Sequence, residues 1–77
     1  MNYKGEANFK IAFSRKIGLK IKNLRILYKV SGKDLAEVVA ISQQQLSRYE
    51  NGFGDISVSK IYLIALYFSV DINYFFD

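Results

Sequence analysis

Apolar residues recur at intervals of three and four positions along most of the chain, which is the spacing of amphipathic helices. The first stripe consists of Ile17, Ile21, Leu24 and Tyr28. Later stripes consist of Leu35, Ala36 and Val39, of Leu46 and Tyr49, and of Val58, Ile61, Ile64, Ala65 and Phe68. A last apolar group holds Ile72, Phe75 and Phe76. These stripes predict an all-α domain of five helices joined by short links.

Polar residues mark the expected helix ends. The side chains that precede a stripe and can cap a helix start through an oxygen are Ser31, Ser42, Ser57 and Asp71. Gln45 lies three residues after Ser42, which makes a capping box. Gly52 suits the left-handed residue that ends a helix, and Phe53-Gly54-Asp55 is expected to form a loop.

Residues 1–16 fit two structures. Phe9, Ile11 and Phe13 alternate as they would in a strand, whereas Phe9, Phe13 and Ile17 fit a helix that runs into the first stripe. A single strand has nothing to pair with unless a partner supplies it. We therefore expect a helical N-terminal extension over 1–16, followed by a domain over 17–77.

The composition argues against several functions. The 77 residues are enough for one domain and include no cysteine and no histidine. Disulfides, thiolate metal ligands and the commonest general base are therefore excluded, and no clustered carboxylate pair replaces them. We expect no cofactor, no metal and no enzymatic activity.

Hydropathy and charge add two expectations. The longest apolar run, 61–68, is too short to span a bilayer, and the N-terminus has no apolar run of signal-peptide length. We therefore expect a cytoplasmic protein that does not engage a membrane. The formal net charge of +4 tilts the choice of partner only slightly toward nucleic acid, because many inert proteins are equally basic.

The stretch 42–52 has two unlike faces. On a helical wheel Leu46 and Tyr49 point inward, and the outward residues are Gln43, Gln44, Ser47, Arg48 and Asn51. Amides and guanidinium groups can make paired hydrogen bonds to the edges of bases. The outward face therefore favours a DNA reader over an ordinary solvated helix face.

Residues 32–51 resemble the helix-turn-helix of phage-repressor and Cro-type proteins, the XRE family. The resemblance rests on Ala36 where the helices cross, on Ala40 in the turn and on Leu46 in the middle of the second helix. The apolar positions Leu35, Val39, Ile41 and Tyr49 also fit. It reaches from about residue 17 to 76 through the patterns Ile21-x-x-Leu24-Arg25 and Leu63-Ile64-Ala65.

The resemblance implies a role for each matching residue. It places the second helix in the major groove, with base readout by Gln43, Gln44, Ser47 and Arg48. It implies backbone contacts from Lys33, Ser42, Asn51 and Gly52, and from N–H groups at helix starts and after Asn51. It also implies a partly buried ion pair between Arg25 and Glu50. Two residues depart from the pattern: Gly32 where the family often has glutamine, and Ala40 where it prefers glycine.

The last two expected helices hold more apolar residues than one inward stripe can use. The surplus residues are Leu63, Leu66, Tyr67, Ile72, Tyr74 and Phe76. Phe9, Ile11 and Phe13 of the extension can cover them, or they can form a homodimer or partner surface, and the two can coexist if the extensions cross between subunits.

The leading hypothesis is a sequence-specific transcriptional regulator, most simply a repressor. It would bind a pseudo-palindromic operator on double-stranded DNA of the nucleoid as a homodimer. The alternative is an antitoxin or phage-type immunity regulator that also holds a protein partner through the apolar C-terminal surface. A third hypothesis is a protein-interaction module that has lost DNA binding, which Gly32 favours slightly and the amide face opposes.

Overall fold

The computed structural model describes the backbone of residues 3–77 and the side chains of residues 8–77. Four α-helices occur in it: α1 (Tyr3–Leu27), α2 (Gly32–Val38), α3 (Gln43–Glu50) and α4 (Val58–Phe68). They are followed by a 3-10 helix, η1 (Ile72–Phe75). No strand occurs within residues 3–77, so the all-α prediction is confirmed over that range. The count of five helices is corrected to four and one 3-10 turn.

The segment expected as a fifth helix is short for a physical reason. The Asp71 carboxylate accepts the Asn73 N–H at 2.8 Å, which fixes the start of a turn. The turn contains only four residues, and hydrogen bonds of the i→i+3 kind close it, such as Tyr74 N–H to the Asp71 carbonyl.

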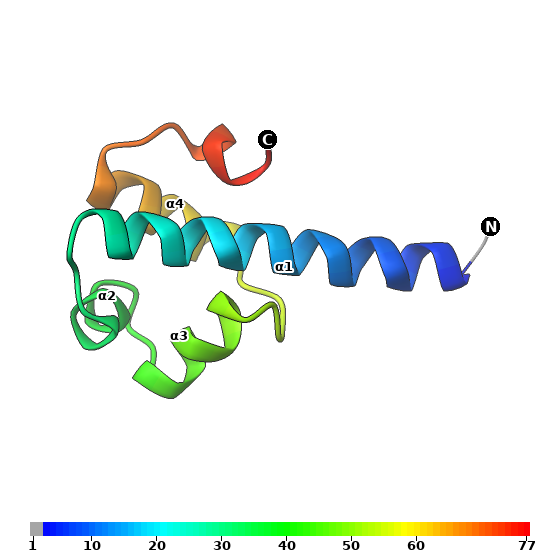
Figure 1. Cartoon of the computed structure of the whole chain (residues 1–77), viewed down its shortest axis with the longest axis horizontal. Coiled ribbons are helices and arrows are strands. Elements are labelled where there is room, and N and C mark those ends of the chain that lie inside the picture. The colour runs from blue at the N-terminus through cyan, green and yellow to red at the C-terminus, as the bar shows by residue number, and fades with distance from the viewer. Residues whose placement is uncertain (1–2) are drawn as a thin grey trace.

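The N-terminal extension and the first predicted helix form one continuous helix of 25 residues. Its axis passes through the expected boundary at 16/17 without a break, and the strand interpretation of Phe9, Ile11 and Phe13 is wrong. The N-terminal half of α1 projects beyond the other elements (Figure 1). Met1 and Asn2, which the extension was expected to include, lie outside the described residues.

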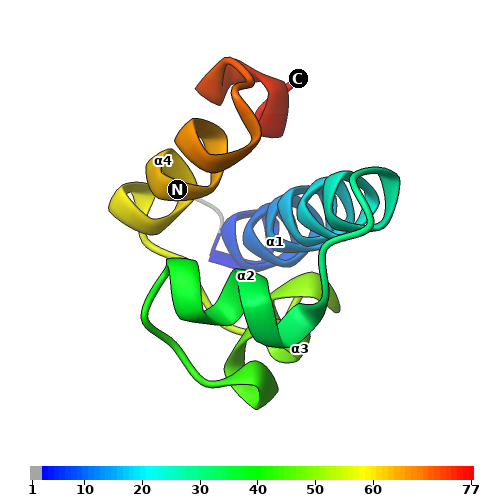
Figure 2. The same ribbon diagram turned by 90° about the vertical axis from the view of Figure 1, so that its left-hand side faces the viewer.

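The remaining elements pack around the C-terminal half of α1. Helices α2 and α3 lie on one side of it, and α4 and η1 lie on the other (Figure 1). Seen along α1, α4 stands beside it above the α2–α3 pair (Figure 2). The buried core consists of Ile17, Ile21, Leu24, Leu35, Ala36, Val39, Leu46, Ile61, Ile64, Ala65, Phe68 and Phe75.

Two residues of the predicted inner stripes are exposed. Tyr28 follows the last residue of α1 and is half exposed, although its ring stacks on Phe68 with centroids 5.4 Å apart. Val58 is the first residue of α4 and is 66% exposed. Both residues lie at helix ends. The chain leaves the helix there, so the 3.6-residue period no longer predicts which side chains face the core.

The predicted helix starts are confirmed. The hydroxyls of Ser31, Ser42 and Ser57 each accept the backbone N–H three residues later, at 3.0, 3.0 and 3.3 Å. These bonds satisfy donors that a helix start leaves without an intrahelical partner.

Candidate nucleic-acid interface

Helices α2 and α3 are joined by a tight turn that fixes their crossing. Ala36 is buried where the two helices approach each other, and its carbonyl accepts the Ile41 N–H at 3.0 Å. Ala40 has φ +56°, the left-handed conformation that the family pattern fills with glycine. The turn between α2 and α3 therefore forms even though alanine disfavours this conformation.

The outward face of α3 has the composition that the sequence predicted. Gln43, Gln44, Ser47 and Arg48 are all exposed, while Leu46 is 1% exposed and packs in the core. Tyr49 is half-buried on the inner side. These four outward positions carry no apolar side chain and no carboxylate, and the one carboxylate of α3, Glu50, is buried.

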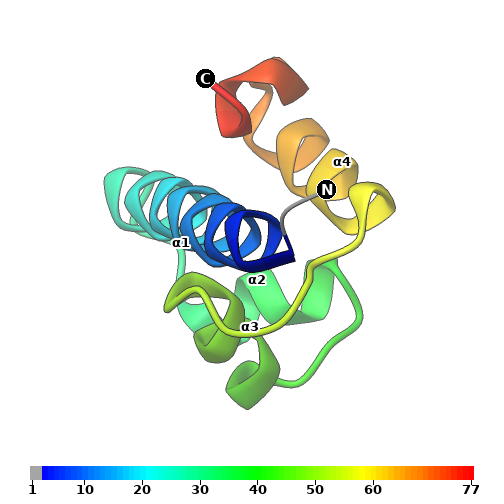
Figure 3. The same ribbon diagram turned by 90° about the vertical axis from the view of Figure 1, so that its right-hand side faces the viewer.

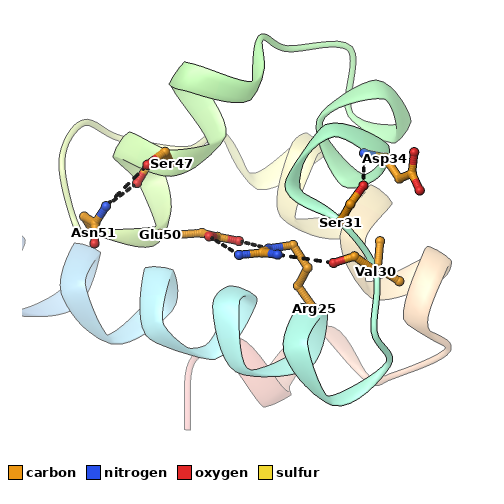
Figure 4. Close-up of polar contacts among 7 residues, drawn as sticks. All are labelled: Arg25, Val30, Ser31, Asp34, Ser47, Glu50 and Asn51. Atoms are coloured by element: carbon orange, nitrogen blue, oxygen red, sulfur yellow. Dashed lines mark hydrogen bonds and ion pairs between the residues drawn. The ribbon is translucent and has the colours of Figure 1, made fainter.

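The residues expected at the DNA backbone lie around both ends of α3. Lys33 and Ser42 are exposed near its N-terminus, and Asn51 is exposed at its C-terminus. The Asn51 amide donates to the Ser47 carbonyl at 2.8 Å, which holds it against α3 (Figure 4). Gly52 has φ +83° and ends the helix as predicted.

The N–H groups after Glu50 are engaged inside the protein. Those of Asn51, Gly52 and Phe53 donate to carbonyl oxygens of Ser47, Tyr49 and Arg48. This pattern closes the C-terminal turn of α3. The N–H groups after Asn51, which the resemblance implied as contacts to the DNA backbone, are therefore already bonded within the protein.

Arg25 and Glu50 form the ion pair that the sequence predicted (Figure 4). Arg25 Nε donates to Glu50 Oε2 at 2.7 Å, and Nη2 donates to Oε1 at 3.0 Å. Nη1 donates to the Val30 carbonyl at 3.2 Å. The Glu50 side chain is only 7% exposed. The hydrogen bond to Glu50 raises the pKa of Arg25, so the guanidinium stays charged, and its bonds to Glu50 tie α3 to α1.

Gly32, the first residue of α2, lies beside the start of α3. A Cβ placed on it would be 3.6 Å from Gln43 Nε2, which is an ordinary van der Waals distance. A side chain at this position would therefore touch the Gln43 side chain. The absence of one leaves the first amide of α3 without that support.

The sequence did not predict two residues that support this interface structurally. Gly18 of α1 packs against the last turn of α3, where a Cβ would overlap the Tyr49 carbonyl oxygen. Lys60 of α4 donates from Nζ to the Val39 carbonyl at 2.9 Å and so holds the end of α2. A glycine inside a helical pattern was the only available signal for the first. Nothing in the sequence singled out Lys60.

Only part of the predicted apolar surface is exposed, and the rest packs against the core. Leu63, Leu66 and Tyr67 on α4 are 42, 57 and 46% exposed. Ile72, Tyr74 and Phe76 are half-buried against the core. From the extension, Phe13 stacks on Phe76 with centroids 5.9 Å apart. Phe9 and Ile11 are themselves exposed, at 70 and 50%, so the extension covers only one end of the surface.

Among the side chains of residues 8–77, no group of three or more His, Cys, Asp or Glu could hold a metal ion. None of the helices described between residues 3 and 77 is long and apolar enough to cross a bilayer.

The fold and the face of α3 define a helix-turn-helix protein. Residues 21–75 match the helix-turn-helix family HTH_3, and the chain belongs to this family. The family is the one that the Cro-type and phage-repressor resemblance predicted, and its members are DNA-binding regulators rather than enzymes.

Named relatives support the assignment. An uncharacterized HTH-type transcriptional regulator of Rickettsia conorii is 43% identical over 61 residues, which are 79% of this chain and 49% of the relative. The antitoxin PezA of Streptococcus pneumoniae is 41% identical over 54 residues, which are 70% of this chain and 34% of PezA. The chain thus spans about half the length, or less, of these relatives.

A solved structure shows the same fold. The restriction-modification controller protein C.AhdI of Aeromonas hydrophila superposes with a TM-score of 0.75 at 20% identity. The superposition covers 83% of this chain and 97% of C.AhdI.

Proposed function

We propose that the chain reads a pseudo-palindromic DNA operator as a homodimer and acts as a transcriptional repressor. In this proposal α3 enters the major groove, and Gln43, Gln44, Ser47 and Arg48 contact base edges. The observation that carries it is the exposed amide and guanidinium face of α3, held on a rigid frame by the Arg25–Glu50 pair. In the proposal, Lys33, Ser42 and Asn51 approach the phosphates with their side chains, while the N–H of Gly52 stays bonded inside the turn.

Repression by occlusion of a promoter needs nothing beyond this domain. The regulator would act on the nucleoid in the cytoplasm. The chain's similarity to HTH-type transcriptional regulators supports a role in regulating transcription.

The test is selection of bound duplexes from a random pool at stated low salt, because affinity for DNA falls steeply with salt. A two-fold symmetric consensus is the expected result. Failure to enrich any sequence at low salt would contradict sequence-specific reading.

Two variants would distinguish residues that read bases from residues that contact the DNA backbone. Gln44→Ala should relax the preference at one position in each half-site, whereas Lys33→Ala should weaken binding to all sequences alike. Asn23→Ala is the matched control, since it removes an exposed amide from α1 on the side turned away from the core. An unchanged consensus for Gln44→Ala would remove Gln44 from the readout.

The alternative is that the chain is an antitoxin, bound both to DNA and to a partner protein through Leu63, Leu66 and Tyr67. The observation in its favour is the 41% identity to the antitoxin PezA. Co-expression with the neighbouring reading frame distinguishes the two: a stable complex that is lost on Leu66→Lys supports the antitoxin function.

A further inference from the structure

The loop between α3 and α4 has little with which to attract a phosphate. Residues 52–57 contain no lysine and no arginine, and their one charged side chain is the carboxylate of Asp55. The N–H groups of Gly52 and Phe53 are used inside the turn that ends α3. By itself, this loop would repel the DNA backbone next to the C-terminal end of α3.

Helix α1 brings two cations to this loop from the segment before the HTH_3 match. Lys10 Nζ lies 2.8 Å from Asp55 Oδ2, in an exposed ion pair that neutralises the only carboxylate of the loop. The loop passes beside the N-terminal half of α1 (Figure 3).

The second cation is Arg15, whose stem lies across Gly52. A Cβ on Gly52 would be 2.5 Å from Arg15 Cγ and 2.9 Å from its Cα, so only glycine lets the two segments approach this closely. Arg15 is exposed, and none of the ion pairs among the side chains of residues 8–77 involves it. The stem of Arg15 is therefore held against Gly52, and its guanidinium has no ion-pair partner among the side chains of residues 8–77.

We propose that Arg15 binds a phosphodiester oxygen of the DNA backbone beside the C-terminal end of α3, with Lys10 screening Asp55 from the same phosphates. This contact rests on the proposed DNA binding and extends its footprint to residues upstream of the family match at 21–75. A guanidinium fork suits phosphate because it can donate two parallel hydrogen bonds. The extension of α1 then replaces the cation and the N–H donors that the loop lacks.

The test measures the affinity of the full chain for a duplex carrying the selected site, as a function of NaCl concentration. One phosphate contact contributes about 0.9 to the slope of log K against log salt, which is about an eightfold change in affinity at 0.1 M salt. Arg15→Gln should lose this amount, and Arg15→Lys should keep most of the slope because it keeps the charge.

Lys16→Gln is the matched control. It removes the same unit charge from the next residue of α1, which points to the other side of the helix, where Lys16 Nζ lies 3.4 Å from the Phe76 carbonyl. Equal losses of slope for Arg15→Gln and Lys16→Gln would mean that only overall charge matters and would overturn the contact. Thermal melts of each variant show whether a loss comes from unfolding.

The screening role of Lys10 has its own test. Lys10→Gln should weaken DNA binding, and adding Asp55→Asn should restore it, because the second change removes the carboxylate left exposed to the phosphates. A Lys10→Gln variant that binds as the parent does would overturn this role. If the parent binds no duplex at low salt, the proposed function fails; if it binds and Arg15→Gln has an unchanged slope, only this contact fails.

Discussion

Gly18 shows how a single residue sets the distance between two helices. It stands inside α1, where glycine normally costs stability. Here the missing Cβ lets the backbone of α1 approach Tyr49 and Glu50 at the end of α3. Seven residues further along α1, Arg25 reaches Glu50, so both contacts fix the same end of α3.

We expect Gly18→Ala to destabilise the protein by about 1–3 kcal/mol, because the added methyl group overlaps the Tyr49 carbonyl and forces the helices apart. In an open helix interior the same change would stabilise by about 1 kcal/mol. Urea unfolding followed by circular dichroism measures the difference. Gly32→Ala is the control, since its Cβ has room and should leave stability unchanged or higher. Stabilisation by both changes would refute the close-approach role.

The Arg25–Glu50 pair predicts a non-additive double-mutant cycle. Arg25→Ala leaves a carboxylate that is only 7% exposed without its partner, which should cost about 3 kcal/mol. Glu50→Ala should cost less, because the Arg25 side chain is 20% exposed and reaches water more easily. The double variant should be more stable than the sum of the two losses predicts. Strict additivity in chemical denaturation would show that the two charges do not interact.

At the scale of elements, all four α-helices end in the same way. Each has a left-handed residue just after it, and the following N–H bonds back to a carbonyl in the last turn. The left-handed residues are Lys29, Ala40, Gly52 and Ser69, with φ of 57, 56, 83 and 56°. Only one of the four is glycine, although a side chain in this conformation costs about 1–2 kcal/mol. The tertiary fold therefore holds three turns that local preference opposes.

Ala40→Gly should stabilise the protein by about 0.5–1 kcal/mol, which is the relief of left-handed strain less the entropy that glycine adds to the unfolded chain. Ala12→Gly makes the same chemical change at an exposed position of α1 and should destabilise by about 1 kcal/mol. Differential scanning calorimetry of the two variants checks the opposite signs. A lower melting temperature for Ala40→Gly would contradict the strain at Ala40.

At the scale of the whole molecule, the structure is an elongated body of 41 × 25 × 20 Å with an apolar patch on α4. Leu63, Leu66 and Tyr67 make up this patch, and nothing in the described chain covers it. A self-complementary face repeats every contact twice about a two-fold axis. In the proposed homodimer, this patch is the candidate contact between the two copies.

Leu66→Lys should weaken a dimer by about a hundredfold, because burying each leucine contributes about 1.5 kcal/mol or more and symmetry doubles the loss. Sedimentation equilibrium over a range of concentrations measures the change. Ile26→Lys is the control, since Ile26 is as exposed as Leu66, at 56 and 57%, but lies on α1 and is not part of the patch. A parent that sediments as a monomer at high micromolar concentration would rule out the dimer.

Local sequence rules by themselves determined the helices and their caps. The stripe spacing, the serines at 31, 42 and 57, and Gly52 each act over a few residues, so their effect can be seen without the fold. The pairing of Arg25 with Glu50 was predicted because the family pattern supplied the long-range partner. The exposed face of α3 followed from its period alone.

Only the tertiary structure decided what depends on how distant segments cross. Gly18 against Tyr49, Arg15 over Gly52, and Lys10 beside Asp55 all join α1 to residues more than 30 positions away. No periodicity encodes such neighbours, because they arise from the angle at which two helices pack. The same packing holds Ala40 in a conformation that alanine alone would avoid.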